Sequence, residues 1–304
     1  MITYPVTNDI LWKELREESQ EIRGSFFEKK ILKCEEKFKS EKFIGYTLPN
    51  KMFNGQKEFL EQTNKIFYPL INAMNKINST MLPELIDVFV CSEGEIKKLM
   101  LVMEYIKGYT LKEAVNHYKS YKKQSADFPT TLNISKFSKF LKKLTDFSED
   151  LLNEGYFHLG LYPSHFILPK SDVIRLTGLR FIMKTEGFIV NDPRIKSLKN
   201  EMKYSFMPPE LYTKIYKESN NSINAIAVLA YQIGILILWG YYQEDLGIYR
   251  IADNQIDLSD EIFDIVPYNK KRKVSDAVWA LLDPDPDIRL NTLQEIRECL
   301  DSIE

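Results

Sequence analysis

The sequence predicts an α+β protein in which a small β-rich part precedes a larger and mostly helical part. Segments rich in β-forming residues cluster in the first 105 residues, and helical patterns dominate the rest. The two patterns change over near Lys107 and Gly108. Strands followed by helices in this order are typical of α+β proteins. We therefore predict an N-terminal extension over residues 1–20, a sheet with one helix over 21–106 and a helical domain over 107–304.

Four segments of the N-terminal part have the composition of strands. They are rich in β-branched, aromatic or alternating apolar residues and cover 27–35, 42–48, 85–90 and 98–105. Residues 38–41 are expected to form the turn of a first hairpin, and Cys91–Gly94 the turn of a second one.

A helix is predicted between the two hairpins. Apolar residues recur at the spacing of an amphipathic helix from Phe59 to Met74. Pro69 lies inside this pattern. Because proline lacks a backbone donor and clashes with the preceding turn, we expect the helix to kink or restart there.

Two segments of the C-terminal part predict long helices. Apolar residues form one helical face from Ile134 to Leu152, and Gly155 follows as a candidate left-handed residue at the helix end. The stretch from Ile223 to Trp239 is apolar on nearly all sides. Such a pattern predicts a helix buried at the centre of a domain.

Composition and charge exclude several classes of protein. The chain has 304 residues with 41 Lys+Arg against 43 Asp+Glu, and a net charge of −2 does not favour binding to nucleic acid phosphates. No uninterrupted apolar run reaches the roughly 18 residues of a membrane span, and residues 1–12 lack the apolar core of a signal peptide. The three widely spaced cysteines fit no disulfide framework, so we expect a cytoplasmic protein with reduced thiols.

Five segments, in order along the chain, resemble the characteristic segments of protein kinases. Leu101–Gly108 is similar to the hinge, and Gly155–Leu168 to the HRDLKPxNIL catalytic loop. Val173–Arg180 is similar to the DFG segment, Phe206–Leu211 to the APE segment and Leu281–Arg289 to the LxxDPxxR stretch. The resemblance covers roughly residues 20–300. It implies a two-lobe fold, with a small antiparallel β-sheet lobe and a larger, mostly helical lobe.

The resemblance also implies where phosphoryl transfer would take place, and there the sequence departs from the family. Transfer needs an Asp beside the substrate hydroxyl, an Asn and an Asp for Mg²⁺, and a Lys for the phosphates. The matching positions hold Gly160, His165, Gly178 and Tyr46. Mg²⁺ prefers carboxylate and carbonyl oxygens, so we expect no metal site among these side chains.

The nucleotide cleft that the resemblance implies is degenerate too. Its lining residues would be Gly24, Phe27, Ile44, Met103, Glu104, Ile106 and Ile167. Only Gly24 remains of the glycines that let backbone amides approach a phosphate. The bulky side chains of Ile44, Tyr46 and Met103 would fill the cleft. We therefore expect no cofactor, and absent or weak binding of Mg-ATP.

The residues that match the family in packing positions are retained. Glu210 and Arg289 match a buried ion pair that joins the activation segment to the last helices. His158 matches an internal hydrophobic column, which favours a packed histidine over a catalytic one. Ile226 or Leu229 would stand where the family has an Asp in the central helix.

Several charged residues have a functional interpretation beside a structural one. Arg180 could fill the metal site with positive charge by pairing with Asp172 or Glu58. Leu159 replaces the Arg that would bind a phosphorylated segment, so phosphorylation at Thr185, Ser197 or Tyr204 has no obvious receiver. We interpret the acidic segment with Asp283, Asp285 and Asp287 as a loop that connects two helices. We interpret the basic cluster of Tyr118, Lys119, Tyr121, Lys122 and Lys123 as a solvated face.

The resemblance and these departures together indicate a pseudokinase. We expect a catalytically inactive domain that acts as a protein-binding scaffold or allosteric regulator, with a protein partner such as an active kinase or another signalling component, and without nucleic acid. The alternative is an atypical kinase, or another phosphoryl or nucleotidyl transferase, that uses displaced groups. Those groups would be Asp172 or Asp192 for metal and Lys42 or Lys51 for phosphate. A third interpretation, a helical interaction module, would lack a five-stranded sheet in the first hundred residues.

Overall fold

The computed structural model of the chain divides into two compact units, Met1–Lys107 and Gly108–Glu304. The division follows Lys107, one residue after the predicted domain boundary. The structure describes residues 3–4, 12–14, 28–34, 41–48, 56–77, 79–93, 96–114, 134–169, 173–199, 201–203, 206–217, 219, 221–242, 264 and 268–303.

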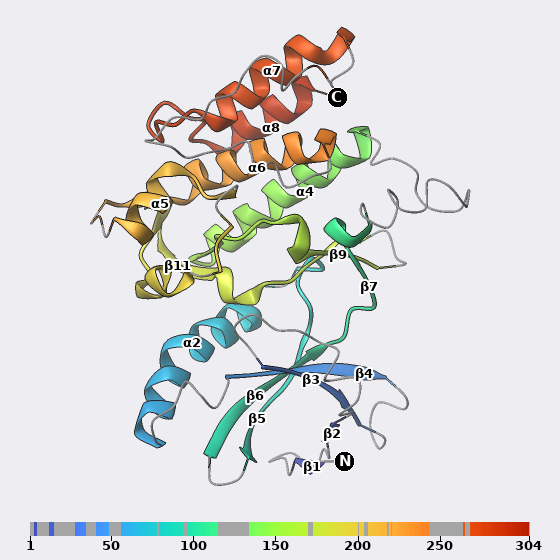
Figure 1. Cartoon of the computed structure of the whole chain (residues 1–304), viewed down its shortest axis with the longest axis vertical. Coiled ribbons are helices and arrows are strands. Elements are labelled where there is room, and N and C mark those ends of the chain that lie inside the picture. Colours follow the sequence, from blue (N-terminus) through green and yellow to red (C-terminus); the bar gives the residue numbers. More distant parts are fainter. Residues whose placement is uncertain are drawn as a thin grey trace. The chain divides into compact units, whose positions relative to one another are not determined.

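The first unit is built on a six-stranded antiparallel sheet (Figure 1). Its strand order is β1-β2-β3-β4-β6-β5. The strands are β1 Thr3–Tyr4, β2 Trp12–Glu14, β3 Glu28–Lys33, β4 Lys42–Thr47, β5 Leu85–Glu93 and β6 Ile96–Glu104. The four strands predicted from the sequence are therefore present as β3 to β6, and the sheet argues against a purely helical module.

One face of this sheet carries a compact apolar core. Side chains alternate between the two faces of a strand, so alternate residues of β3 to β6, with Cys34 just after β3, contribute to the same layer. The buried members of this core cluster are Leu32, Cys34, Phe43, Phe89, Cys91, Met100 and Val102. Gly45 lies beneath them, because a Cβ there would stand 2.6 Å from the sulfur of Met100.

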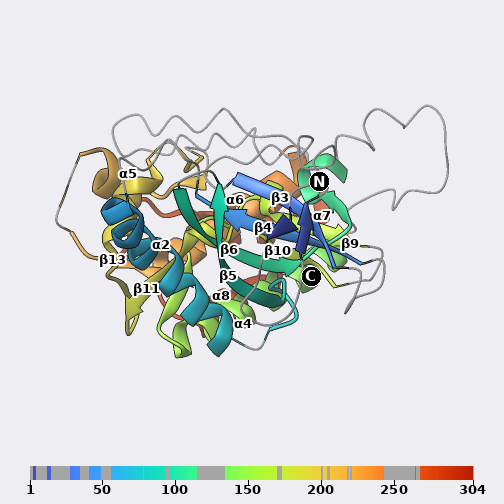
Figure 2. The ribbon, with the colours of Figure 1, turned by 90° about the horizontal axis from the view of Figure 1, so that it is seen from below.

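Helix α2, Gln56–Lys76, packs on β5 and β6 (Figures 1 and 2). Its buried residues Phe67, Leu70 and Ala73 recur at the spacing of one helical face. Pro69 lies inside α2, and the helix continues through it. Of the predicted kink or restart, the restart is therefore wrong, and Leu70, which follows Pro69, is buried while Tyr68, which precedes it, is exposed.

Two other predictions for the first unit are wrong. Within residues 1–20, which were expected to form an extension without strands of the sheet, Thr3–Tyr4 and Trp12–Glu14 form β1 and β2, and β2 pairs with β3 at the edge of the sheet. The second hairpin does not turn at Cys91–Gly94, since β5 runs to Glu93 and Cys91 pairs with Lys98. Of the turn predicted at 38–41, only Glu41 is among the described residues.

Among its described residues, the second unit has a layer of long helices (Figure 1). They are α4 Ile134–Asn153, α6 Ala225–Tyr242, α7 Tyr268–Leu282 and α8 Leu293–Ser302. Helix α6 packs on α4 and α7, and α8 packs on α4 and α7. The residues of α6 from Ala225 to Trp239 are buried, as the sequence predicted. Gly155, after α4, has the predicted left-handed conformation with φ of 79°.

The second unit contains more strand than the sequence predicted. A three-stranded sheet has the order β10-β9-β7, and a four-stranded sheet has the order β13-β12-β11-β8. These short strands are β7 Gly108–Thr110, β8 Tyr156–His158, β9 Phe166–Pro169, β10 Arg175–Leu176, β11 Ile182–Glu186, β12 Ile189–Val190 and β13 Ile223–Asn224. The chain is thus a mixed α and β protein with small antiparallel sheets, and no helix among its described residues is long and apolar enough to cross a membrane.

A buried ion pair joins α5, Pro209–Tyr216, to the loop before α8. The Arg289 guanidinium donates to the two carboxylate oxygens of Glu210 at 2.8 and 3.2 Å. Arg289 also donates to the carbonyl oxygens of Ala227 and Asp283, and it lies 5.1 Å from the ring centre of Tyr231. The pair that the sequence comparison implied therefore fixes α5, α6 and the loop together.

We expect Glu210→Gln to destabilise the protein strongly. Arg289 has no exposed surface, so the substitution would leave a buried charge without its counterion, at a cost of about 3–5 kcal/mol. Urea denaturation followed by circular dichroism measures this change in the free energy of unfolding.

Asp276→Asn is the matched control, because the Arg272–Asp276 pair is exposed and its N–O distance is 3.8 Å. An exposed pair contributes less than about 1 kcal/mol. Equal losses in the two variants would contradict the importance of the Glu210–Arg289 pair.

Candidate functional site

The segment that resembles a catalytic loop connects β8 to β9 in the second unit. β8 pairs with β11, with His158 opposite Ile182, and this pairing fixes the start of the loop. The short 3-10 helix η2, Pro163–His165, returns the chain toward β9. The loop brings Gly160, His165 and Gly178 together, whereas Tyr46 belongs to the first unit.

His158 is a buried and neutral histidine. Its Nε2 lies 3.2 and 3.1 Å from the carbonyl oxygens of Thr177 and Gly178, and its Nδ1 accepts from the amide of Gly160. Nε2 must therefore carry the proton. Burial, and then the charge of nearby His165, lowers the pKa of His158 to about 3. His158 thus connects two segments as a packed side chain, as the sequence predicted.

His165 occupies the space beside the two glycines. Its Nδ1 lies 2.6 Å from the carbonyl oxygen of Gly160, so this nitrogen donates. A Cβ at Gly178 would stand 2.7 Å from the same nitrogen, and Gly178 has φ of 76°, which also favours glycine. A Cβ at Gly160 would stand 2.7 Å from the ring of Phe181. The loop has no room for a carboxylate at either position unless a ring is displaced.

Aromatic rings complete this part of the loop. We call His158, Tyr162, His165, Phe181 and Phe206 the loop aromatic cluster. Ring centres lie 4.9 Å apart for Tyr162 and His165, 5.0 Å for His165 and Phe181, and 5.3 Å for Tyr162 and Phe206. Burial raises the pKa of Tyr162 well above its usual value, and its hydroxyl donates to the sulfur of Met202. The cluster is therefore a packing core.

The cluster has poor donors for a hard cation. Its members offer imidazole nitrogens and one phenol, and Mg²⁺ prefers carboxylate and carbonyl oxygens. Within the described part of the chain, no group of three or more His, Cys, Asp or Glu side chains is placed to hold a metal ion. The described contacts of these side chains are packing contacts and hydrogen bonds within the loop.

Among the described residues, Arg180 contacts two groups that the sequence did not predict. It forms an ion pair with Glu201 and donates to the carbonyl oxygen of Ser197 at 2.9 Å. Burial, and then the charge of Arg194, lowers the pKa of Arg180 to about 10, so it stays protonated at neutral pH. Asp172 lies outside the described residues, and the side chain of Glu58 is not described.

Asp192 is also committed to an arginine. Arg194 donates from Nε to Oδ1 at 2.9 Å and from a terminal nitrogen to Oδ2 at 2.6 Å. Backbone amides of Arg194 and Lys184 donate to the same carboxylate. Burial alone would raise the pKa of Asp192, but these hydrogen bonds and the charge of Arg194 lower it. The proposed use of Asp192 as a metal ligand is therefore not supported.

Gln232 is the loop contact that the sequence did not predict. It lies on the buried helix α6, and its Nε2 donates to the carbonyl oxygen of Leu159 at 2.5 Å. Ile226 and Leu229, expected near the loop, are buried apolar residues of the same helix. The only sequence signal for Gln232 was a polar side chain in an otherwise apolar helix, which requires an internal partner.

In the first unit, Tyr46 has a cross-strand lysine neighbour. Lys29 pairs with Tyr46 across β3 and β4, and its Nζ lies 5.8 Å from the ring centre. Burial raises the pKa of Tyr46 and lowers the pKa of Lys29. Lys42, which the sequence offered as a phosphate ligand, is exposed, and Lys51 lies outside the described residues. Lys29 is therefore the lysine that the structure brings to Tyr46.

The residues predicted to line a nucleotide cleft belong to both units. In the first unit, Ile44 pairs with Met103 across β4 and β6, while Glu104 and Ile106 are half-buried. In the second unit, Ile167 lies on β9 between Thr110 and Arg175. Gly24 and Phe27 lie outside the described residues, as do Tyr118, Lys119, Tyr121, Lys122, Lys123 and Tyr204.

The acidic loop before α8 is a connecting loop. Asp283 accepts from the amide of Asp285, and Asp285 accepts from the amide of Asp287, so the carboxylates cap local turns. The fixed backbone of this loop presents the carbonyl oxygen of Asp283 to Arg289.

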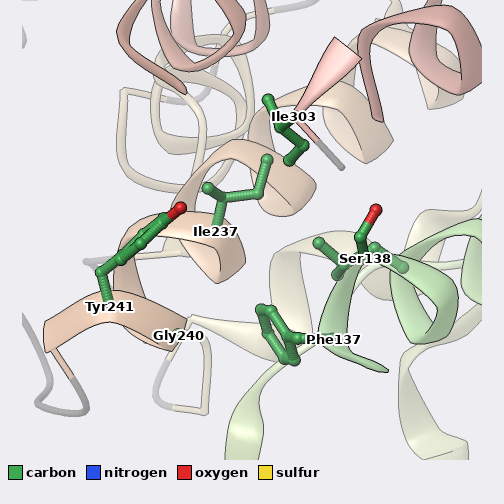
Figure 3. Close-up of a pocket in the computed structure, with 7 residues that line it drawn as sticks. Phe137, Ser138, Ile237, Gly240, Tyr241 and Ile303 are labelled. Carbon is green, nitrogen blue, oxygen red and sulfur yellow. The ribbon is translucent and has the colours of Figure 1, made fainter. Parts of the chain in front are cut away.

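A small cavity lies among α4, α6 and the end of the chain (Figure 3). Phe137, Ser138, Leu141, Ile237, Gly240, Tyr241 and Ile303 line it. Its volume of about 10 Å³ is that of a single water molecule. It is too small for a nucleotide or another metabolite, for which pockets of about 300–1,000 Å³ are usual.

Comparisons with known proteins give no relative. No protein-family model matches the chain, and no curated protein matches it. The functional interpretation therefore depends on the chemistry of the residues themselves.

We expect Gly178→Ala to destabilise the protein by about 2–5 kcal/mol. Left-handed backbone costs a non-glycine residue about 1–2 kcal/mol, and a forced contact adds about 1–3 kcal/mol. The contact cannot relax easily, because the hydrogen bond to Gly160 holds His165 in place. Chemical denaturation measures the effect.

Gly187→Ala is the control for this prediction. Gly187 also has a left-handed conformation with φ of 58°, but no atom lies within 4 Å of a Cβ built there. Gly187→Ala should lower the free energy of unfolding by about 1–2 kcal/mol, because only the backbone conformation is strained. Similar losses in both variants would show that His165 does not confine Gly178.

We expect His158 to make the stability of the protein depend on pH. Because its pKa is lowered to about 3 in the folded chain, the unfolded chain binds an extra proton between that pH and about 6.5. The stabilisation is complete above pH ~6.5 and is lost as the pH falls toward 3, by up to about 1.4 kcal/mol per pH unit.

The test compares His158→Gln with the wild type by urea denaturation between pH ~4 and ~7. Carboxylates contribute to both proteins, so the difference between the two curves isolates the histidine. The difference should shrink as the pH falls. Parallel curves would contradict a buried neutral His158.

Proposed function

We propose that the chain is a catalytically inactive, protein-kinase-like domain that acts as a protein-binding scaffold or allosteric regulator. The observation that carries the proposal is the packing around Gly160 and Gly178. At these two positions, which match the catalytic Asp and a metal-binding Asp, the rings of Phe181 and His165 occupy the space of a side chain. Loss of both groups removes the base and a metal ligand together.

Further support comes from the residues that would bind phosphates. Tyr46 stands at the position of the ATP-binding lysine, and burial keeps its phenol neutral. A neutral phenol cannot supply the positive charge that a triphosphate needs. The position of the metal-binding Asn holds His165, which donates to Gly160 and packs against two rings.

The alternative is a transferase that uses displaced groups. Asp192 would be its metal ligand, but both oxygens of Asp192 accept hydrogen bonds from Arg194 and backbone amides. Lys42 would be its phosphate ligand, but it is exposed on β4. Asp172 and Lys51, the other two groups of this alternative, lie outside the described residues. The contacts of Asp192 favour the inactive domain.

Binding of a protein partner is the function that we propose for a domain that catalyses no phosphoryl transfer. The buried ion pair, the neutral His158 and the loop aromatic cluster hold the loop in one conformation. The proposed partner is an active kinase or another signalling component.

We expect Mg-ATP to leave the melting temperature of the chain unchanged. A ligand present at about 100 times its dissociation constant stabilises a folded protein by about 2.7 kcal/mol, which would be a clear upward shift. The measurement is a thermal shift with Mg-ATP and with ATP alone, beside a labelled-ATP turnover assay and an active kinase as the positive control.

Lys29→Met is the informative variant in this experiment. If the wild type were stabilised by Mg-ATP and transferred the label, and the variant did neither, Lys29 would bind phosphates and the proposal of an inactive domain would fail. If neither protein responds and no label is transferred, the proposal stands.

A further inference from the structure

The surface around α5 carries an unusual excess of positive charge. Between residues 194 and 217 the sequence has six Lys and Arg but two carboxylates, in a chain whose net charge is −2. The 3-10 helix η4, Pro193–Leu198, packs on α5. We call Lys196, Lys199, Lys214 and Lys217, which these two elements and their ends carry, the η4–α5 basic surface.

Both carboxylates of this segment point inward. Glu201 pairs with Arg180, and Glu210 pairs with Arg289. Their side chains are 13 and 8% exposed. Within the described part of the chain, no carboxylate lies within 4.0 Å of the ammonium groups of the η4–α5 basic surface. The charge of these lysines is therefore left for solvent or for a partner.

Contacts between η4 and α5 hold the lysines in one surface. The hydroxyl of Tyr216 donates to the carbonyl oxygen of Lys199, and the Lys199 ammonium lies 5.2 Å from the centre of the same ring. Lys196 and Lys199 are three residues apart in a 3-10 helix, so they share a face. Lys214 and Lys217 are three residues apart at the end of α5, so they also lie on one face.

We propose that the η4–α5 basic surface binds an acidic segment of a protein partner. This inference rests on the proposed function, because it names the chemistry of the partner that an inactive scaffold would hold. Four lysines on two adjacent elements match a short run of carboxylates. Positive charge of this kind steers association and weakens with salt.

Nucleic acid fits this surface less well. Single strands bind where aromatic rings are open for base stacking. Tyr212 and Tyr216 instead stack on each other, with ring centres 4.9 Å apart, and Lys199 lies over Tyr216. A net charge of −2 also repels a long phosphate backbone outside the surface itself.

The test measures binding of a fluorescein-labelled, glutamate-rich peptide to the full chain by fluorescence anisotropy. The basic-surface variant is Lys196→Glu/Lys199→Glu/Lys217→Glu. The control is Lys139→Glu/Lys143→Glu/Lys273→Glu, which changes the net charge equally at exposed lysines of α4 and α7. We expect the first variant to weaken binding at least about tenfold and the control less than about twofold, with the wild type losing affinity between about 50 and about 200 mM salt.

Lys196→Ala/Lys217→Ala keeps the test decisive if the triple variant does not fold, because the ammonium groups of these two lysines form no hydrogen bond or ion pair with the described residues. It should weaken binding in the same direction. Equal losses in the basic-surface and control variants would overturn the proposal. So would tighter binding of a single-stranded oligonucleotide of equal charge, which would assign the surface to nucleic acid. Labelled-ATP turnover is measured on the same proteins, so a failure of the inactive-domain proposal is seen independently of peptide binding.

Discussion

The close approach of two rings to two glycines is the constraint on which the loop depends. His165 lies against Gly178 and donates to the carbonyl oxygen of Gly160, while Phe181 lies against Gly160 itself. Each contact requires that the glycine has no side chain, and the left-handed conformation of Gly178 requires it again. The same packing buries His158 and keeps it neutral. Both of its ring nitrogens form hydrogen bonds with backbone groups, one with the carbonyl oxygen of Gly178 and one with the amide of Gly160. The side chains around the two glycines therefore form a packed interior.

The charged groups of the second unit follow a complementary rule. Arg289, Arg194 and Arg180 each enter the interior with a carboxylate, because a buried charge without a counterion costs several kcal/mol. Each pair also satisfies backbone carbonyl oxygens, so the arginines connect elements that are far apart in sequence. One consequence reaches the surface: the carboxylates used inside are not available outside, and the lysines of η4 and α5 dominate the charge there. The pairing of carboxylates with buried arginines therefore also leaves the surface of η4 and α5 positively charged.

Periodicity and composition predicted those parts of the fold that are set locally. The strands β3 to β6, the helices α4 and α6 and the left-handed Gly155 follow from patterns within short windows. The strands β1 and β2 were missed because two or three residues carry no periodic signal and are defined by their ladder partner. The pairing of Arg180 with Glu201 and of Asp192 with Arg194 was not predicted, because an ion pair depends on distances in the folded chain. Gly160 and Gly178 were recognised as losses of chemistry, but only the coordinates indicate that neighbouring rings have taken the space. The resemblance to protein kinases itself stays a prediction.

A crystal structure of the chain grown with ATP and Mn²⁺ tests the central claim most directly, because Mn²⁺ replaces Mg²⁺ and is located by its anomalous scattering. We expect no anomalous peak beside Gly160 and Gly178, and we expect His165 Nδ1 to remain in contact with the carbonyl oxygen of Gly160. A manganese ion bound there together with a triphosphate, and His165 turned away from Gly160, would contradict it.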